Sequence, residues 1–247
     1  MKLVIKAGEV MLCSGAEIYR VEDTMERMLG ACENIEDIQV VCTYSSIMVS
    51  FYYDNHVVTS IRKIRNISTN LEKISDVNNF SREFVSKKIS LEGAILDLEG
   101  IVAKDGLSSC AQIFAFAMVS SFFTLTLDGS LVDFISTFII TSLSQYISYL
   151  TASQGRKYFI DTLLSSFIIT FLAFFISFLG VPLDANKVVM GSIYMLFPGI
   201  SLTNSVRDFM NRDLLAGTIG LIQAVLVAGA LATGVGIVIL IHSKLVV

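Results

Sequence analysis

The feature that most constrains this chain is a series of five long apolar stretches, none of which contains Lys, Arg, Asp or Glu. An α-helix needs about 20 apolar residues to cross the hydrocarbon core of a bilayer. The stretches have about that length or more and are joined by short polar segments: 108–127, 134–155, 162–183, 188–206 and 214–241. The sequence therefore predicts a membrane domain over residues 108–247 with five transmembrane helices.

A soluble helical bundle is the alternative explanation for these stretches. Helices of a soluble bundle carry a polar face, and here "FISTFIITSLSQYISYL" offers only Ser, Thr, Gln and Tyr as polar groups. The chain as a whole is 53% apolar with a mean hydropathy of +0.69, above the values of ordinary soluble domains. The membrane interpretation is favoured.

The charged residues are concentrated in the first 107 residues, which hold 12 of the 18 Lys and Arg and 16 of the 22 Asp and Glu. This bias predicts a separate soluble domain over residues 1–107. Basic residues near the spans fall mainly on the side of this domain: Lys104, Arg156, Lys157, Arg207 and Arg212, against Lys187 and Lys244 on the other side. The positive-inside rule then places residues 1–107 in the cytoplasm and the C-terminus outside.

The N-terminal part has the patterns of a small α+β domain. Apolar and small residues spaced alternately by three and four predict one helix over residues 3–28, in which Gly15 costs about 1 kcal/mol relative to Ala. Residues 38–53 alternate as a strand does, and Asp54–Asn55 suits a hairpin turn into the next strand. Two further helices are expected, the second with Ser90 as its N-cap: 70–87 and 91–103.

The fourth apolar stretch ends in an unusual segment, "FPGISLTNSVRD". Pro198 and Gly199 break the helix, and backbone groups freed at membrane depth need other partners. Four polar side chains then share one helix face: Ser201, Asn204, Ser205 and Asp208. Broken helices with polar groups form solute sites in many transporters, so this segment, with Arg207 as a partner for a carboxylate, is the candidate substrate site. A simple proline kink with Arg207 and Asp208 at the membrane surface is the alternative.

The fifth stretch carries a small residue at every fourth position: Ala216, Gly220, Ala224, Ala228, Ala232 and Gly236. Such a stripe lets helix backbones approach closely in a membrane. The partner is either the chain's own bundle, which the stripe alone favours, or another subunit. Gln145 and Gln223 are isolated polar residues in the spans that bind solute or brace helices.

No pattern in the chain points to an enzyme, a cofactor, a metal site or a nucleic-acid surface. The four cysteines form no CxxC pair, His56 has no triad or metal-ligand spacing, and there is no phosphate-binding or dinucleotide-binding motif. No catalytic residue is expected, and reduced packing thiols explain the cysteines.

Three segments together resemble the threonine/serine exporter family: "SGAEIYRVEDTMERM", "VNNF" and "PGISLTNSVRDFMNRDLLAG". The likeness covers nearly the whole chain and is greatest to the large subunit of the split type, which works with a small membrane subunit as a succinate exporter. It implies a bacterial inner-membrane secondary exporter of small carboxylated metabolites, such as threonine, serine or a dicarboxylate. It also implies a small partner subunit, because five spans form only half of an inverted pair, and it favours a subunit interface for the small-residue stripe.

The resemblance also assigns residues. In the first helix it implies a gating or coupling motif: Gly15, Ala16, Glu17, Tyr19, Arg20, Val21 and Glu22. Around the fourth span it implies these substrate-site positions: Pro198, Gly199, Asn204, Arg207 and Asp208, with Gly217 beyond. Where the family pattern has a charged residue in the last span, this chain has Gln223, so no charged substrate contact is expected there.

Two functions remain open at this point. In the first, the chain is an exporter subunit, and the acids at span ends are the available proton carriers: Asp128, Asp133 and Asp161. In the second, it is a membrane-anchored sensor or scaffold whose cytoplasmic domain binds a ligand or protein. A pure anchor needs neither a broken fourth helix nor polar groups within it.

Overall fold

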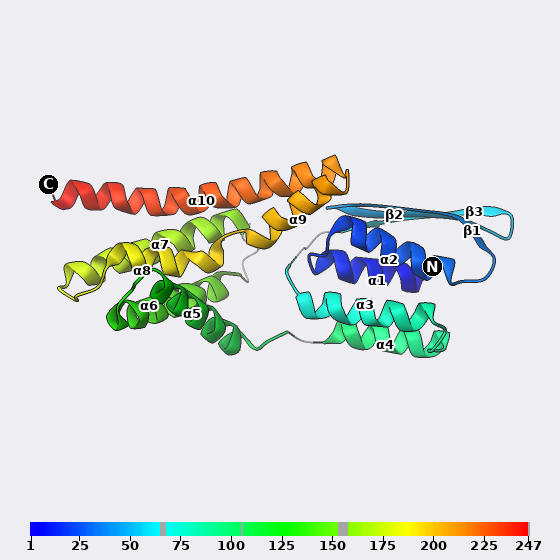
Figure 1. Ribbon diagram of the computed structural model, residues 1–247, viewed down its shortest axis with the longest axis horizontal. Coiled ribbons are helices and arrows are strands. Elements are labelled where there is room, and N and C mark those ends of the chain that lie inside the picture. The colour runs from blue at the N-terminus through cyan, green and yellow to red at the C-terminus, as the bar shows by residue number, and fades with distance from the viewer. Residues whose placement is uncertain (65–67, 105, 153–157, 247) are drawn as a thin grey trace. The chain divides into compact units, whose positions relative to one another are not determined.

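The computed structural model describes residues 1–64, 68–104, 106–152 and 158–246 (Figure 1). The chain forms two compact units: Met1–Gly106 with Thr203–Leu221, and Leu107–Leu202 with Ile222–Val247. The sequence placed residues 203–221 in the membrane domain. The structure instead groups them with the N-terminal residues, because Ala216 joins the apolar core of the first unit. Arg156 and Lys157, used above for the orientation, lie outside the described residues.

The first unit begins with two helices, α1 (Lys2–Cys13) and α2 (Ile18–Gly30), where the sequence predicted one. The single-helix prediction is wrong because Gly15 has a φ of +82°, in the left-handed region that favours glycine. A Cβ at Gly15 would also lie 3.3 Å from the carbonyl oxygen of Ser68. Gly15 therefore forms a turn between two helices, and its helix-interior cost does not arise.

An antiparallel sheet of three strands follows, in the order β1 (Ile35–Thr43), β2 (Ser46–Tyr53) and β3 (His56–Lys63). The predicted hairpin turn at Asp54–Asn55 is confirmed, since both residues have positive φ as a type I′ turn requires. The range predicted as one strand contains a second turn and forms two strands. Alternate side chains of these strands enter the core: Val40, Cys42, Ile47, Val49 and Phe51.

Two helices complete the N-terminal part of this unit, α3 (Leu71–Val85) and α4 (Leu91–Ala103). The hydroxyl of Ser90 accepts a hydrogen bond from the backbone N–H of Gly93 at 3.2 Å, which confirms the predicted N-cap. α3 packs against α1, α2 and α4. An α+β arrangement of helices on one face of a small sheet results.

Helices joined by short loops make up the described residues of the second unit, which contain no strand. Four helices of the chain are long and apolar enough to cross a membrane: α5 (Ser109–Thr126), α6 (Leu131–Ala152), α7 (Tyr158–Phe178) and α10 (Leu214–Val246). The fourth predicted span, 188–206, is not one helix. It is divided among α8 (Ala185–Ile193), a 3-10 turn at Tyr194–Leu196 and α9 (Gly199–Met210), and the break falls at Pro198 as expected (Figure 1).

Candidate functional site

The polar face of α9 lies against the turn between α1 and α2 in the first unit. Asn204 donates a hydrogen bond from its side-chain nitrogen to the carbonyl oxygen of Gly15, at 3.1 Å. The left-handed turn at Gly15 ends α1, so that carbonyl has no place in a helix ladder. A contact across 189 residues of sequence thus joins the two segments that carry the family resemblance.

An ion pair lies next to this contact. The guanidinium of Arg207 binds one carboxylate oxygen of Glu17, and the other oxygen of Glu17 is 3.6 Å from the guanidinium of Arg20. Glu17 is buried, at 7% exposure, whereas about half of the Arg207 side chain is exposed. A buried carboxylate therefore holds an arginine whose side chain reaches solvent.

Asp208, one residue further along α9, is 1% exposed. Neither of its carboxylate oxygens has a hydrogen-bond partner among the described residues. Burial raises the pKa of Asp208 to about 6, helped by the negative charges of Asp213 and Glu22 and opposed by Arg207. Asp208 therefore loses its proton at a higher pH than an ordinary aspartate does.

Two further groups complete the surroundings of Asp208. Glu22 accepts a hydrogen bond from the backbone N–H of Cys42 at 2.7 Å, and burial raises the pKa of Glu22 despite that bond. The phenol of Tyr44 is hydrogen-bonded to Ser205, and burial followed by the charge of Asp208 raises the pKa of Tyr44. The turn residue Tyr44 therefore connects the sheet to α9.

Gly220 allows α10 to lie directly against the side chains of Ser205 and Tyr44. A Cβ at Gly220 would collide with the hydroxyls of Ser205 and Tyr44, so any side chain there would displace them. Gly217 is likewise closed off by the ring of Phe209. The predicted small-residue stripe therefore starts as a close contact within the first unit.

The structure brings together seven of the predicted site residues in the first unit: Gly15, Glu17, Glu22, Asn204, Ser205, Arg207 and Asp208. Other members of the motif lie beside them, with Ala16 and Tyr19 half-buried and Arg20 exposed. In the second unit Pro198 is buried, while Gly199, Ser201 and Gln223 are exposed. Sequence reasoning missed Tyr44 and Asp213, which lie in short turns where no pattern singles them out.

The small-residue stripe is only partly buried. Ala216, Gly220 and Ala224 are buried, but Ala228 and Gly236 are half-buried and Ala232 is exposed. Four residues turn a helix by about 400°, so a strict four-residue stripe moves around the axis while the buried seam repeats at about 3.5 residues. The seam continues through other residues: Val227, Leu231, Gly234 and Val238.

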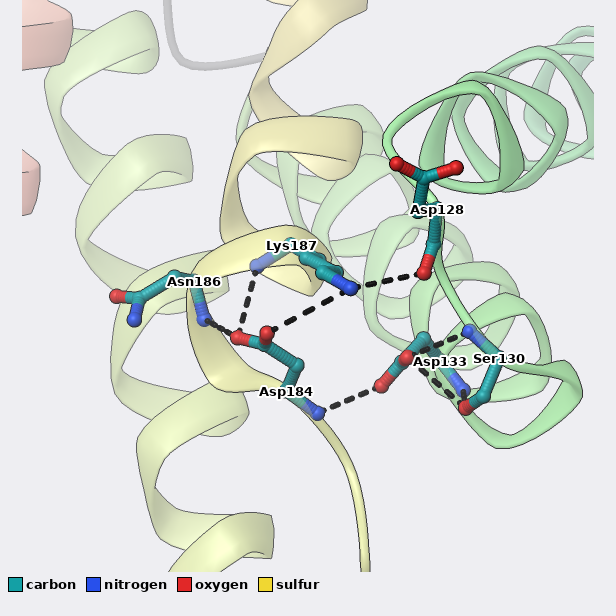
Figure 2. A network of polar contacts seen from close by, with 6 residues as sticks. All are labelled: Asp128, Ser130, Asp133, Asp184, Asn186 and Lys187. Atoms are coloured by element: carbon teal, nitrogen blue, oxygen red, sulfur yellow. Dashed lines mark hydrogen bonds and ion pairs between the residues drawn. The ribbon is translucent and has the colours of Figure 1, made fainter.

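A polar network fixes the start of α8 in the second unit (Figure 2). One carboxylate oxygen of Asp133 accepts hydrogen bonds from the N–H and the hydroxyl of Ser130 at 2.7 and 2.9 Å, and the other accepts the N–H of Asp184 at 2.7 Å. Asp184 in turn caps α8, and the ammonium of Lys187 donates to the carbonyl of Asp128 at 2.8 Å. With three donors on its carboxylate, Asp133 is suited to holding a loop rather than to carrying protons.

A groove of about 900 Å³ is also present in the first unit, between α1, β3 and α4. Its lining is largely apolar, with Leu3, Ile61 and Ile95 among the residues, and it contains none of the predicted site residues. The candidate site is therefore defined by its polar contacts on α9 and not by this groove.

Comparison with known proteins supports the same assignment. A family model named ThrE and described as "Putative threonine/serine exporter" matches residues 2–242. Searches of curated proteins and of solved structures found no match. The matched range includes both segments that meet at Asn204 and Gly15, together with α5, α6, α7 and nearly all of α10. The chain is therefore a multi-pass membrane protein that belongs to the threonine/serine exporter family.

Proposed function

We propose that this chain is the large subunit of a secondary exporter for small solutes that carry a carboxylate, such as threonine, serine or a dicarboxylate like succinate. Family membership supports a threonine/serine exporter. The observation that carries the site is the contact of α9 with the turn at Gly15, through Asn204 and the Arg207–Glu17 ion pair. This contact links a substrate segment to a gating segment.

The proposed mechanism is competition between carboxylates. Glu17 holds Arg207 with the same chemical group that the substrate presents. A substrate carboxylate that binds Arg207 in two parallel hydrogen bonds releases Glu17, and α9 is then free to leave the turn. Binding of solute thereby shifts the equilibrium between two arrangements of α9.

The proposed topology has five crossings, with the fourth formed by residues 188–206, which include most of α8 and the start of α9. Residues 1–107 lie in the cytoplasm and the C-terminus lies outside the bacterial inner membrane. A small membrane subunit supplies the second half of the transporter, since an odd number of crossings suits an inverted pair. The less buried part of the stripe, at Ala228, Ala232 and Gly236, offers a surface for that subunit or for a second copy of this chain.

The test is efflux from preloaded cells that lack their own exporters. The chain is expressed alone and with the small membrane protein encoded beside it, and release of threonine, serine and succinate is measured. We expect efflux only when both proteins are present. The absence of efflux for every solute, with both proteins confirmed in the membrane, would reject the exporter.

A membrane-anchored sensor is the second candidate, but family membership does not favour it. Asn204→Ala separates the two, because it removes the hydrogen bond to Gly15 without adding bulk. An exporter loses efflux in this variant. A variant that retained every measurable activity would instead favour a sensor.

A further inference from the structure

The interface between α5, α6 and α8 in the second unit is lined by hydroxyl groups. The three helices pack against one another in pairs. Their buried hydroxyl side chains are these: Ser120, Ser121, Thr124, Ser136, Thr137, Thr141, Ser144 and Ser192. Ser and Thr are common at interfaces between membrane helices, where their hydroxyls bond a neighbouring helix or their own backbone.

Two of these helices meet along successive turns. The hydroxyls of Thr124 on α5 and Thr137 on α6 are 2.9 Å apart. Because a short turn joins the two helices, they run antiparallel, and residues one helical turn further along each come next to one another. Ser120 and Thr141 occupy that next level of the interface.

α8 contacts α5 beside the same two residues, Ser120 and Thr124. A Cβ at Gly191 would lie 3.2 Å from the carbonyl oxygen of Ser120 and would collide with the hydroxyl of Thr124. The backbone of α8 therefore touches α5 there, and Ser192 is the adjacent residue. α8 thus brings a further buried hydroxyl, that of Ser192, within one residue of this contact.

Four of the hydroxyls have no hydrogen-bond partner within the described ranges, and we call them the hydroxyl cluster: Ser120, Thr141, Ser144 and Ser192. Each of these residues is at most 2% exposed. In helices such hydroxyls commonly bond the carbonyl four residues earlier, as Ser121 does here at 2.7 Å. A buried hydroxyl without a partner destabilises the fold, so the cluster is costly unless it binds a ligand.

We propose that the hydroxyl cluster binds the transported solute, a zwitterion such as threonine, during its passage through the membrane. A hydroxyl donates to a carboxylate and accepts from an ammonium, so uncharged hydroxyls serve both ends of an amino acid. They cannot neutralise a dianion, whose burial is far more costly. The inference rests on the proposed exporter function and adds where the solute binds; threonine and serine are already the solutes that family membership indicates.

The first test removes a hydroxyl while keeping shape. Thr141→Val and Ser192→Ala are expected to lower threonine efflux at least about tenfold, which corresponds to about 1.4 kcal/mol for one lost hydrogen bond. Stability is expected to stay the same or rise, because the removed group had no protein partner. Thr170→Val is the matched control: Thr170 is equally buried, but its hydroxyl donates to the carbonyl of Ser166 at 2.8 Å, so efflux should be unchanged. Full efflux in Thr141→Val and Ser192→Ala would overturn the inference.

The second test does not depend on efflux. In a background whose four cysteines are replaced by serine, Ser192→Cys is treated in membranes with a small charged methanethiosulfonate reagent. We expect slow modification that threonine suppresses and succinate does not, and no modification of the control Ser166→Cys, whose native hydroxyl donates to the carbonyl of Leu163.

The outcomes separate the two proposals. No modification of the cysteine at position 192, or modification insensitive to threonine, rejects the solute site whether or not efflux occurs. Protection by succinate rejects the assignment to a zwitterion. Protection by threonine in a protein that exports nothing would keep the binding site and reject the exporter.

Discussion

The α9 site and the hydroxyl cluster both contain buried polar side chains, but the chemical type of these side chains differs. In the first unit, Arg207 and Asp208 are charged or chargeable, and the buried Glu17 is held by an arginine. In the second unit, the buried polar side chains of the α5–α6–α8 interface are almost all hydroxyls, and four of them are unpartnered among the described residues. A charged side chain is stable where solvent or a counter-ion lies close to it. Inside an apolar helix bundle, burying a neutral hydroxyl costs much less free energy than burying a charge. Charged side chains therefore characterise the α9 site, and neutral hydroxyls characterise the α5–α6–α8 interface.

The largest effect is expected from removing the arginine of the α9 site. Arg207→Ala should abolish efflux while the protein still folds and inserts, since Glu17 retains Arg20 and the exposed half of Arg207 limits the stability loss to about 1 kcal/mol. Efflux assays and membrane fractionation measure the two effects. Arg62→Ala, which removes another arginine paired to a glutamate in the same unit, is the control and should export normally. Unchanged efflux in Arg207→Ala would show that Arg207 does not bind substrate and only lies at the membrane surface.

The second prediction adds a bulky side chain next to the hydroxyl cluster and leaves its hydroxyls in place. Gly191→Val should lower the free energy of unfolding by about 3 kcal/mol, because the new side chain collides with Thr124 and with the backbone at Ser120. Thermal unfolding in detergent measures it. At Gly229 a Cβ meets no described atom within 4 Å, so Gly229→Val should leave stability nearly unchanged. Equal behaviour of the two variants would show that α8 is not held tightly against α5.

The third prediction concerns how the ionisation of Asp208 in the α9 site makes stability depend on pH. Because the folded-state pKa of Asp208, about 6, lies above the ordinary value of 3.8, its ionisation destabilises the fold at higher pH. Asp208→Asn should therefore be more stable than wild type by about 2–3 kcal/mol above pH 7. The advantage should shrink as pH falls through 6 and vanish below about pH 4, where Asp208 is protonated in both the folded and unfolded states. A difference independent of pH in unfolding measurements would contradict the assigned environment of Asp208.

The smallest effect is expected at the rim of the second unit. Asp184→Ala removes the side chain that accepts from the N–H groups of Asn186 and Lys187 at the start of α8. The cost should be about 1 kcal/mol of unfolding free energy, typical of a lost N-cap. Asp184→Asn, which keeps a capping oxygen, should lose much less. A loss of several kcal/mol in Asp184→Ala would mean that the Asp133 network carries more of the fold than its contacts indicate.

Local patterns predicted much of the fold correctly. The hairpin at Asp54–Asn55, the cap at Ser90 and the break at Pro198 all depend on neighbouring residues, whose conformational preferences are readable in sequence. The division at Gly15 was missed because apolar spacing continues through the turn. Only the approach of Ser68 and the positive φ distinguish that glycine from one inside a helix.

The candidate site was predicted as two separate halves. Arg207, Asn204 and Glu17 were singled out, but no sequence pattern indicated that they contact one another across about 190 residues. Tyr44 and Asp213 were missed because single polar residues in turns are common. The stripe on α10 was predicted as a face, yet its burial changes along the helix as the small residues move away from the seam.

The sequence alone determined that this chain enters a membrane, which of its segments are apolar enough to do so, and which family it resembles. These properties depend on composition, length and short motifs, so they need no knowledge of long-range contacts. Only the tertiary structure decided that Glu17 holds Arg207, that Asp208 is buried among acids, and that four buried hydroxyls on three helices have no partner among the described residues. Such pairings arise when distant segments pack together, and burial then sets the energy and protonation of each polar group.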